Sequence, residues 1–221
     1  MRTVVFDLDG TLADTSGDLI AAANACFRQM GEGDILVPET DAATALRGGR
    51  AMLTLGLTRL GQTAEPTFLD RFYPVLLDAY EQAIDTHTVF YPRAMETVEA
   101  LKRDGYKVAI CTNKPEYLAR LLMDRLGALD SFGALIGADT LPVRKPDPEP
   151  LREAARRAGG DPARALLVGD TVTDRETSRA AGLPSVLVRF GPGDDALDDL
   201  TPEAIIDHFD ELPDVVRKLI G

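Results

Sequence analysis

The sequence has little of the chemistry that sulfur and imidazole provide. It contains two cysteines, two histidines and no tryptophan among its 221 residues. Neither Cys26 nor Cys111 belongs to a Cys-x-x-Cys motif or a Cys/His cluster, and a catalytic thiolate would need a nearby histidine. A chain of this length can fold without disulfides. We therefore expect both cysteines to be small buried hydrophobic residues in a reducing compartment.

Long apolar runs and basic clusters are also lacking. No apolar stretch approaches the roughly 20 residues of a membrane span, and the first residues do not form a secretory signal. Lys and Arg number 24 against 36 Asp and Glu, which gives a formal charge of −12. This balance disfavours nucleic acid and anionic membrane surfaces as partners. The expectation is a cytoplasmic globular protein.

Short apolar segments alternate with helical patterns over the second half of the chain. The segments are continuously apolar, which is typical of strands buried on both faces of a parallel sheet. The helical patterns between them end in glycine, as C-terminal caps do. The pattern predicts an α/β fold, a doubly wound parallel sheet. Its predicted strands are 4–6, 108–111, 134–137, 165–168 and 185–188, with a weaker one at 205–206.

One long interval breaks this alternation. Residues 7–107 contain no convincing strand, but three amphipathic helical patterns lie at 19–30, 51–60 and 68–80. This is too much chain for one crossover between strands. We predict an inserted α-helical cap domain at 15–89, with the α/β core formed by 1–14 and 90–221.

Polar residues follow the predicted strands at several places. In an open parallel sheet, ligands bind outside the carboxyl ends of the strands. Carboxylates gathered there repel one another unless a cation is present, and an all-oxygen ligand set suits Mg²⁺. Mg²⁺ and a lysine together would make a site for a phosphoryl group, with one carboxylate as nucleophile and another as general acid. The segments are Asp7-Leu8-Asp9-Gly10-Thr11, Thr112-Asn113-Lys114-Pro115, Arg144-Lys145-Pro146-Asp147-Pro148 and Gly169-Asp170-Thr171-Val172-Thr173-Asp174.

These four motifs, in this order, resemble those of the haloacid dehalogenase superfamily, and within it the phosphoglycolate phosphatases. The resemblance implies a Rossmann-like core with a small helical cap. It implies that Asp7 is the nucleophile that forms an aspartyl-phosphate. Asp9 would be the general acid and then the base. Lys145 would neutralise charge on the nucleophile and on the phosphoryl group.

The remaining motif residues receive supporting roles from the same resemblance. Thr112 and the backbone N–H of Asn113 would hold phosphoryl oxygens. Asp170 would bind Mg²⁺ directly, and Asp174 would support it from nearby, either directly or through water. The full implied metal site consists of Asp7, Asp9 (through its backbone carbonyl), Asp170 and Asp174. Two other interpretations stay open: Thr112 and Asn113 can cap the following helix, and Asp174 can be purely structural.

The cap contains a loop at residues 46–53 that resembles the family's substrate loop. In phosphoglycolate phosphatases this loop usually reads Gly-x-Gly. Here Arg47 replaces the first glycine, Gly49 is the second, and Arg50 follows. An arginine at this place can pair with a substrate carboxylate, or it can be a solvated surface residue. Arg47, Gly49 and Arg50 are therefore candidate substrate-binding residues.

The resemblance implies a Mg²⁺-dependent phosphomonoesterase of a small phosphorylated metabolite, with 2-phosphoglycolate as the leading candidate. The alternatives are a β-phosphoglucomutase-like phosphotransferase, and a pyrophosphatase or nucleotidase of the same superfamily. Such mutases tend to have Ser-Ala-Ser-Lys where this chain has Cys-Thr-Asn-Lys, which favours the phosphatase. A binding protein that had lost the chemistry would be expected to lack one of the four central motif residues. The expected assembly is a monomer or a homodimer.

Overall fold

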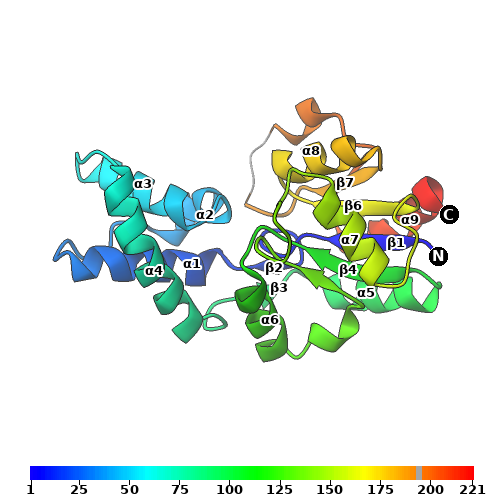
Figure 1. The fold of residues 1–221 in the computed structure, drawn as a ribbon, viewed down its shortest axis with the longest axis horizontal. Coiled ribbons are helices and arrows are strands. Elements are labelled where there is room, and N and C mark those ends of the chain that lie inside the picture. The colour runs from blue at the N-terminus through cyan, green and yellow to red at the C-terminus, as the bar shows by residue number, and fades with distance from the viewer. Residues whose placement is uncertain (193–195) are drawn as a thin grey trace. The chain divides into compact units, whose positions relative to one another are not determined.

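The computed structural model describes residues 1–192 and 196–221 (Figure 1). Within these residues the chain divides into two compact units. The larger unit consists of Met1–Ala13 and Phe90–Gly221, and the smaller one of Asp14–Val89. The smaller unit is thus an insertion in the chain of the larger one.

The larger unit is built on a parallel sheet with β1 near its middle. The strand order is β5-β4-β1-β6-β7-β8, and Val4 of β1 lies opposite Val108 on one side and Leu166 on the other. All residues of β1 and β6 are buried, which explains their continuously apolar sequence. The predicted α/β sheet is confirmed. Its strands are β1 (Thr3–Phe6), β4 (Lys107–Cys111), β5 (Leu135–Ile136), β6 (Ala165–Gly169), β7 (Ser185–Val188) and β8 (Ala204–Ile206).

Helices cover both faces of this sheet. Helix α7 packs on the face that carries Val5, Ala109 and Leu167. Gly105 and Gly127, which follow α5 and α6, have φ of +85° and +68°, so they end these helices as predicted. The helices are α5 (Ala94–Arg103), α6 (Glu116–Arg125), α7 (Glu149–Arg157), α8 (Val172–Ala181) and α9 (Leu212–Ile220), with 3₁₀ turns at Leu129–Ser131, Leu197–Leu200 and Phe209–Glu211.

The smaller unit is helical. Helix α1 packs against the other three. A Cβ on Gly56 of α3 would lie 2.1 Å from the Phe27 ring of α1, so glycine lets these two helices approach closely. One helix, α2, was not predicted, because proline usually breaks a helix; here Pro38 lies in the first turn, where proline is tolerated. The helices are α1 (Ser16–Gln29), α2 (Pro38–Leu46), α3 (Gly49–Arg59) and α4 (Pro66–Gln82).

The expectation that residues 7–107 contain no strand is wrong in one place. β2 (Ala13–Asp14) and β3 (Val89–Phe90) form a two-stranded sheet where the chain enters and leaves the insertion. The Tyr91 N–H donates to the Leu12 carbonyl beside it, at 3.0 Å. Strands of two residues are too short to show a period in the sequence.

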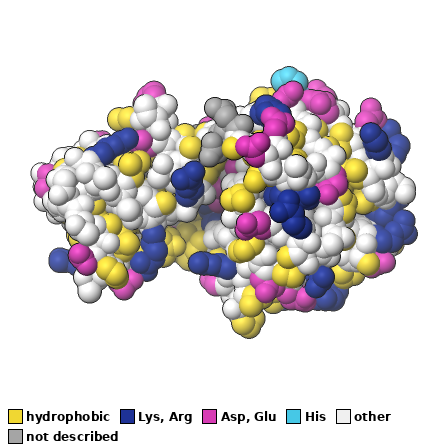
Figure 2. Space-filling view, turned by 90° about the horizontal axis from the view of Figure 1, so that it is seen from above, with side chains coloured by type: hydrophobic (Ala, Val, Ile, Leu, Met, Phe, Trp, Pro, Cys, Tyr) yellow, Lys and Arg dark blue, Asp and Glu magenta, His cyan; other side chains and the backbone are white. Residues whose placement is uncertain are grey.

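The surface carries both signs of charge. Figure 2 shows acidic and basic side chains interspersed over the visible face. Cys26 and Cys111 are both free thiols and both buried, as predicted. No helix among the described residues is long and apolar enough to cross a membrane.

Asp18 is a buried carboxylate in the first turn of α1. Its side chain accepts hydrogen bonds from the His87 N–H (2.9 and 3.0 Å), the Thr88 N–H (2.9 Å) and the Thr88 hydroxyl (2.8 Å). Asp18 is only 2% exposed and Thr88 5%, so the contact between these two residues is shielded from water. The carboxylate therefore fastens the start of the insertion to its end.

Replacing Asp18 by alanine removes the acceptor of the buried Thr88 N–H and hydroxyl. We expect Asp18→Ala to lower the free energy of unfolding by about 2–4 kcal/mol, measured by chemical denaturation. Asp78→Ala, at an exposed position of α4, is the matched control and should change it by less than about 0.5 kcal/mol. Equal effects of the two substitutions would contradict the assigned role of Asp18.

Candidate active site

The loop after β1 presents the first two carboxylates. Asp7 directly follows the strand, and its N–H donates to the Val168 carbonyl of β6 at 2.8 Å. Gly10 has φ of +80°, which turns the chain sharply after Asp9. One turn later, the Thr11 hydroxyl donates to Asp170 Oδ1 at 2.6 Å. The loop is thus fastened to the end of β6.

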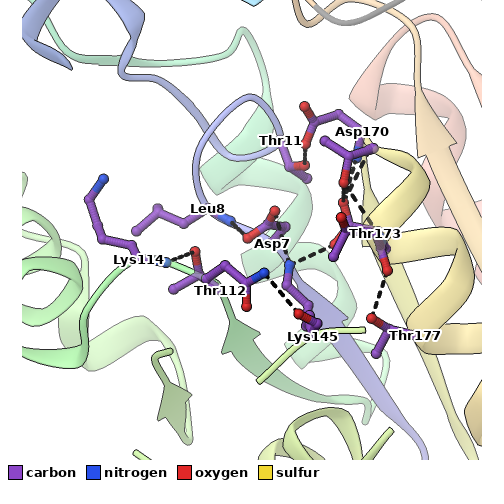
Figure 3. A network of polar contacts seen from close by, with 12 residues as sticks. Asp7, Leu8, Thr11, Thr112, Lys114, Lys145, Asp170, Thr173 and Thr177 are labelled. Carbon is purple, nitrogen blue, oxygen red and sulfur yellow. Dashed lines mark hydrogen bonds and ion pairs between the residues drawn. The ribbon is translucent and has the colours of Figure 1, made fainter. Parts of the chain in front are cut away.

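Lys145 joins this loop to the start of α8. Its Nζ lies 3.0 Å from Asp7 Oδ2 and 2.6 Å from Asp174 Oδ1, and Figure 3 shows the ammonium directed at Asp7. The side chain is 2% exposed. The Asn113 amide donates to the Lys145 carbonyl at 3.1 Å. Residues distant in sequence therefore meet at the carboxyl ends of β1, β4 and β6.

Three buried carboxylates gather at this point. Asp7, Asp170 and Asp174 each offer an oxygen, and these atoms lie within 4.8 Å of one another. Three carboxylates against the single ammonium of Lys145 leave two formal negative charges in the cluster. The buried Asp170 Oδ2 has no hydrogen-bond partner among the residues that the structure describes. This donor set fits a hard divalent cation, so the cluster can hold a metal ion.

The pKa values of Asp7, Asp170 and Lys145 reflect the burial of this cluster and the repulsion between its carboxylates. Burial, together with the carboxylates of Asp174 and Asp9, raises the pKa of Asp7 to about 6 despite the opposing effect of Lys145. Burial, together with Asp174 and Asp7, also raises the pKa of Asp170. For Lys145, burial lowers the pKa, but Asp174 and Asp7 outweigh it, so the pKa is raised and the ammonium stays charged.

Asp174 combines a local role with its place in the cluster. Its Oδ2 accepts hydrogen bonds from the Thr171 hydroxyl (2.6 Å), the Thr171 N–H (3.1 Å) and the Asp170 N–H (3.3 Å), which forms a capping box at the start of α8. Its Oδ1 accepts from Lys145. Helix capping therefore orients a carboxylate that also faces the lysine.

Gly169, the last residue of β6, makes room for this carboxylate. A Cβ on Gly169 would lie 2.3 Å from Asp174 Cγ, a distance that requires a shift. The strand pattern drew attention to the aspartates that follow and not to this glycine. A glycine that ends an otherwise apolar strand is a sequence signal for such a close approach.

Thr112 and Asn113 follow β4 and face the same edge of the sheet. The Thr112 hydroxyl accepts from the Lys114 N–H at 3.2 Å, and Thr112 is 3% exposed. The following helix, α6, has Pro115 at its N-cap and no side-chain capping hydrogen bond. The interpretation of Thr112 and Asn113 as a cap of that helix is therefore wrong; they form a tight turn instead.

Lys114 is a site residue for which the sequence pattern predicted no role. Its Nζ lies 2.7 Å from Asp9 Oδ1, and the two side chains are 4% and 16% exposed. Asp9 is therefore not a member of the three-carboxylate cluster, and its side chain pairs with the Lys114 ammonium. The signal was present, because Lys114 lies in the motif that follows β4, at the edge where the other site residues were expected.

The other three candidate residues lie in the smaller unit, where α2 meets α3. Arg47 follows α2 and is exposed. The Arg50 guanidinium pairs with Asp70 at 2.6 Å and lies over the Tyr73 ring at 5.1 Å. This exposed pair holds the Arg50 side chain against α4.

Gly49 is the first residue of α3 and is buried. A Cβ there would lie 3.0 Å from the nearest atoms of Tyr73 and Leu76. Packing of α3 on α4 therefore favours glycine at this position. This packing requirement for glycine does not depend on any contact with a substrate.

Comparison with known proteins decides the family. The model of a family of hydrolases, the haloacid dehalogenase-like hydrolases, matches residues 1–182. The chain belongs to this family. The resemblance seen in the motifs is confirmed.

Curated relatives in the family are named as phosphatases. The chain is 39% identical to the phosphoglycolate phosphatase of Mesorhizobium japonicum, with 98% of this chain and 96% of the relative covered. It is 36% identical to that of Caulobacter vibrioides, with 99% and 92% covered. The haloacid dehalogenase-like hydrolase described here is therefore an enzyme, a phosphatase.

Solved structures share its fold. A predicted phosphoglycolate phosphatase from Haemophilus somnus matches with a TM-score of 0.81 at 23% identity, over 97% of both chains. A putative β-phosphoglucomutase from Thermotoga maritima matches with a TM-score of 0.72 at 21% identity, over 99% of this chain and 100% of that one. The fold is common to both names, so it does not separate a phosphatase from a mutase.

Gly169→Ala tests the close approach in this site. The added methyl group must displace Asp174, and with it the carboxylate that faces Lys145. We expect phosphatase activity to fall at least about 100-fold, because misplacement of a site group by about 1 Å has an effect of this size. The measurement is hydrolysis of p-nitrophenyl phosphate, alongside thermal unfolding to show that the variant folds.

Gly133→Ala is the matched control. Its Cβ would meet Ala158 at 3.3 Å, a mild contact outside the candidate site. It should retain most of the activity. A folded Gly169→Ala protein with full activity would show that Asp174 needs no such space.

Proposed function

We propose that the chain is a Mg²⁺-dependent phosphomonoesterase that acts on a small phosphorylated metabolite through an aspartyl-phosphate on Asp7. The observation that carries this proposal is the buried meeting of Asp7, Lys145, Asp170 and Asp174. Three carboxylates beside one ammonium suit a site that receives a divalent cation and a phosphoryl dianion together. We propose 2-phosphoglycolate as the substrate, supported by the names of the relatives.

Asp170 is the proposed direct ligand, because its buried Oδ2 lacks a partner among the described residues. Asp7 and the backbone carbonyl of Asp9 would complete the protein ligands, with Asp174 in support. When bound there, Mg²⁺ would balance the carboxylates and stabilise negative charge on the phosphoryl group. The Thr11 hydroxyl, which donates to Asp170 Oδ1, orients this ligand for its role.

Asp7 is the proposed nucleophile. One of its oxygens attacks phosphorus, and the bond from phosphorus to the ester oxygen breaks. Lys145, at 3.0 Å from Asp7 Oδ2, holds the carboxylate in place and offsets charge on the transferring group. The Thr112 hydroxyl and the Asn113 N–H are proposed to hold phosphoryl oxygens at the end of β4.

Asp9 is the proposed general acid and base. It gives a proton to the ester oxygen as the alcohol leaves. It then takes a proton from the water that attacks phosphorus and releases phosphate from Asp7. Both steps need a carboxyl group close to the nucleophile but outside the metal cluster, and Asp9 meets this need because it faces Lys114 instead.

We propose that the helical insertion acts as a cap that excludes water during the reaction. Arg47, Gly49 and Arg50 would then contribute to substrate binding, with Arg47 or Arg50 contacting a distal acidic group. A mutase, a pyrophosphatase and a nucleotidase remain alternatives for the finer activity. A cytoplasmic location and a monomeric or homodimeric state remain predictions.

Asp7→Asn tests the nucleophile and EDTA tests the metal. With Mg²⁺ we expect the native enzyme to hydrolyse p-nitrophenyl phosphate. An amide cannot form the acyl phosphate, so Asp7→Asn should lose at least about 1,000-fold in kcat. EDTA should abolish turnover, and added Mg²⁺ should restore it. Asp78→Asn, at an exposed site of α4, is the control; robust turnover in EDTA would overturn the mechanism.

Arg47→Ala and Arg50→Ala test the cap residues. If either arginine contacts a distal acid, its loss should raise KM for carboxylated phosphate esters about 10-fold or more, because a charge-assisted hydrogen bond disappears. The measurement is kcat and KM across 2-phosphoglycolate, hexose phosphates, nucleoside monophosphates and pyrophosphate. Unchanged KM for every carboxylated ester would refute the contact, and a better substrate elsewhere in the panel would replace 2-phosphoglycolate.

A further inference from the structure

Lys114 is held rigidly at the edge of the candidate site. Its N–H donates to the Thr112 hydroxyl at 3.2 Å, and its carbonyl accepts from the Ala138 N–H at 2.9 Å. Pro115 follows and restricts the backbone further. The side chain is 4% exposed. The Lys114 ammonium is therefore held at a defined position, whereas most lysine side chains extend into solvent.

The position of that ammonium follows from its contact with Asp9. The two groups are 2.7 Å apart. A general acid must lie within hydrogen-bond distance of the ester oxygen that it protonates. The ester oxygen and the Lys114 ammonium would thus both adjoin the same carboxyl group. A substituent one or two bonds from the ester oxygen lies within reach of Lys114.

Two lysine ammonium groups lie at this edge of the sheet, and each pairs with different carboxylates. Lys145 faces Asp7 and Asp174, whereas Lys114 faces Asp9. Figure 3 shows the Lys145 ammonium beside Asp7 and the Lys114 ammonium apart from it. Lys114 therefore places a second positive charge beside the proposed general acid, apart from the one that faces the nucleophile.

We propose that Lys114 selects phosphate monoesters that carry a carboxylate on the carbon next to the ester oxygen. This inference rests on the proposed function and names a residue of the larger unit that would recognise the substrate. In the free enzyme the ammonium faces Asp9. In the complex it binds the substrate carboxylate, which supplies negative charge while Asp9 carries the proton for the leaving alcohol. A buried ammonium strengthens this contact because water screens it little.

Three esters separate carboxylate recognition from general catalysis. 2-Phosphoglycolate has the carboxylate in the proposed position, 2-hydroxyethyl phosphate replaces it by a neutral alcohol, and the phosphate ester of 3-hydroxypropionate moves it one carbon away. In the native enzyme kcat/KM should be highest for 2-phosphoglycolate. In Lys114→Met it should fall at least about 30-fold more for 2-phosphoglycolate than for 2-hydroxyethyl phosphate, because only the former loses a charged partner.

Two further variants complete the comparison. Lys114→Arg keeps the charge and should retain part of the preference, and Lys102→Met, a lysine on α5 that pairs with Glu99, should leave the ratio unchanged. If Lys114→Met does not fold, Lys114→Gln takes its place against Lys114→Arg. Equal losses on both esters, or no preference for the carboxylate in the native enzyme, would overturn the inference. The proposed function fails separately, if Asp7→Asn still hydrolyses the neutral ester.

Discussion

The buried contact of Lys145 with Asp7 and Asp174 is the interaction on which the site depends. Three carboxylates cannot remain charged side by side in a buried pocket without positive charge nearby. Lys145 supplies part of it at 3.0 and 2.6 Å, and its own pKa rises because these carboxylates surround it. Loss of the lysine would leave the cluster without its fixed cation.

Around that contact, every part of the site is oriented by a neighbour. The Thr171–Asp174 capping box aims Asp174, Thr11 holds one oxygen of Asp170, and Asn113 holds the backbone of Lys145. Glycine at 169 provides the space in which Asp174 can lie against the strand. These hydrogen bonds hold the charged groups in place before a substrate binds, and such preorganisation favours catalysis by charged groups.

Much of the fold could be predicted from the sequence, because buried parallel strands are continuously apolar and helix ends carry glycine. The strand at 185–188 was predicted to the residue. Helix α2 and the β2–β3 pair were missed, since Pro38 resembles a break and two-residue strands have no period. Four carboxylates and Lys145 were expected to converge at one edge of the sheet; the structure brings Asp7, Asp170 and Asp174 together with Lys145, whereas Asp9 pairs with Lys114. The contact of Lys114 with Asp9 depends on side-chain direction, which no spacing in the sequence encodes.

The β2–β3 pair has a consequence for how such an enzyme can change over evolution. Because the chain leaves and re-enters the larger unit on two paired strands, the whole insertion is, topologically, one long loop between two neighbouring strands. A longer or shorter insertion between the same two strands would leave the register of the parallel sheet untouched, and the entropy of closing a loop grows only slowly with its length. This one segment can therefore be exchanged while the residues at the carboxyl ends of the parallel strands are inherited unchanged.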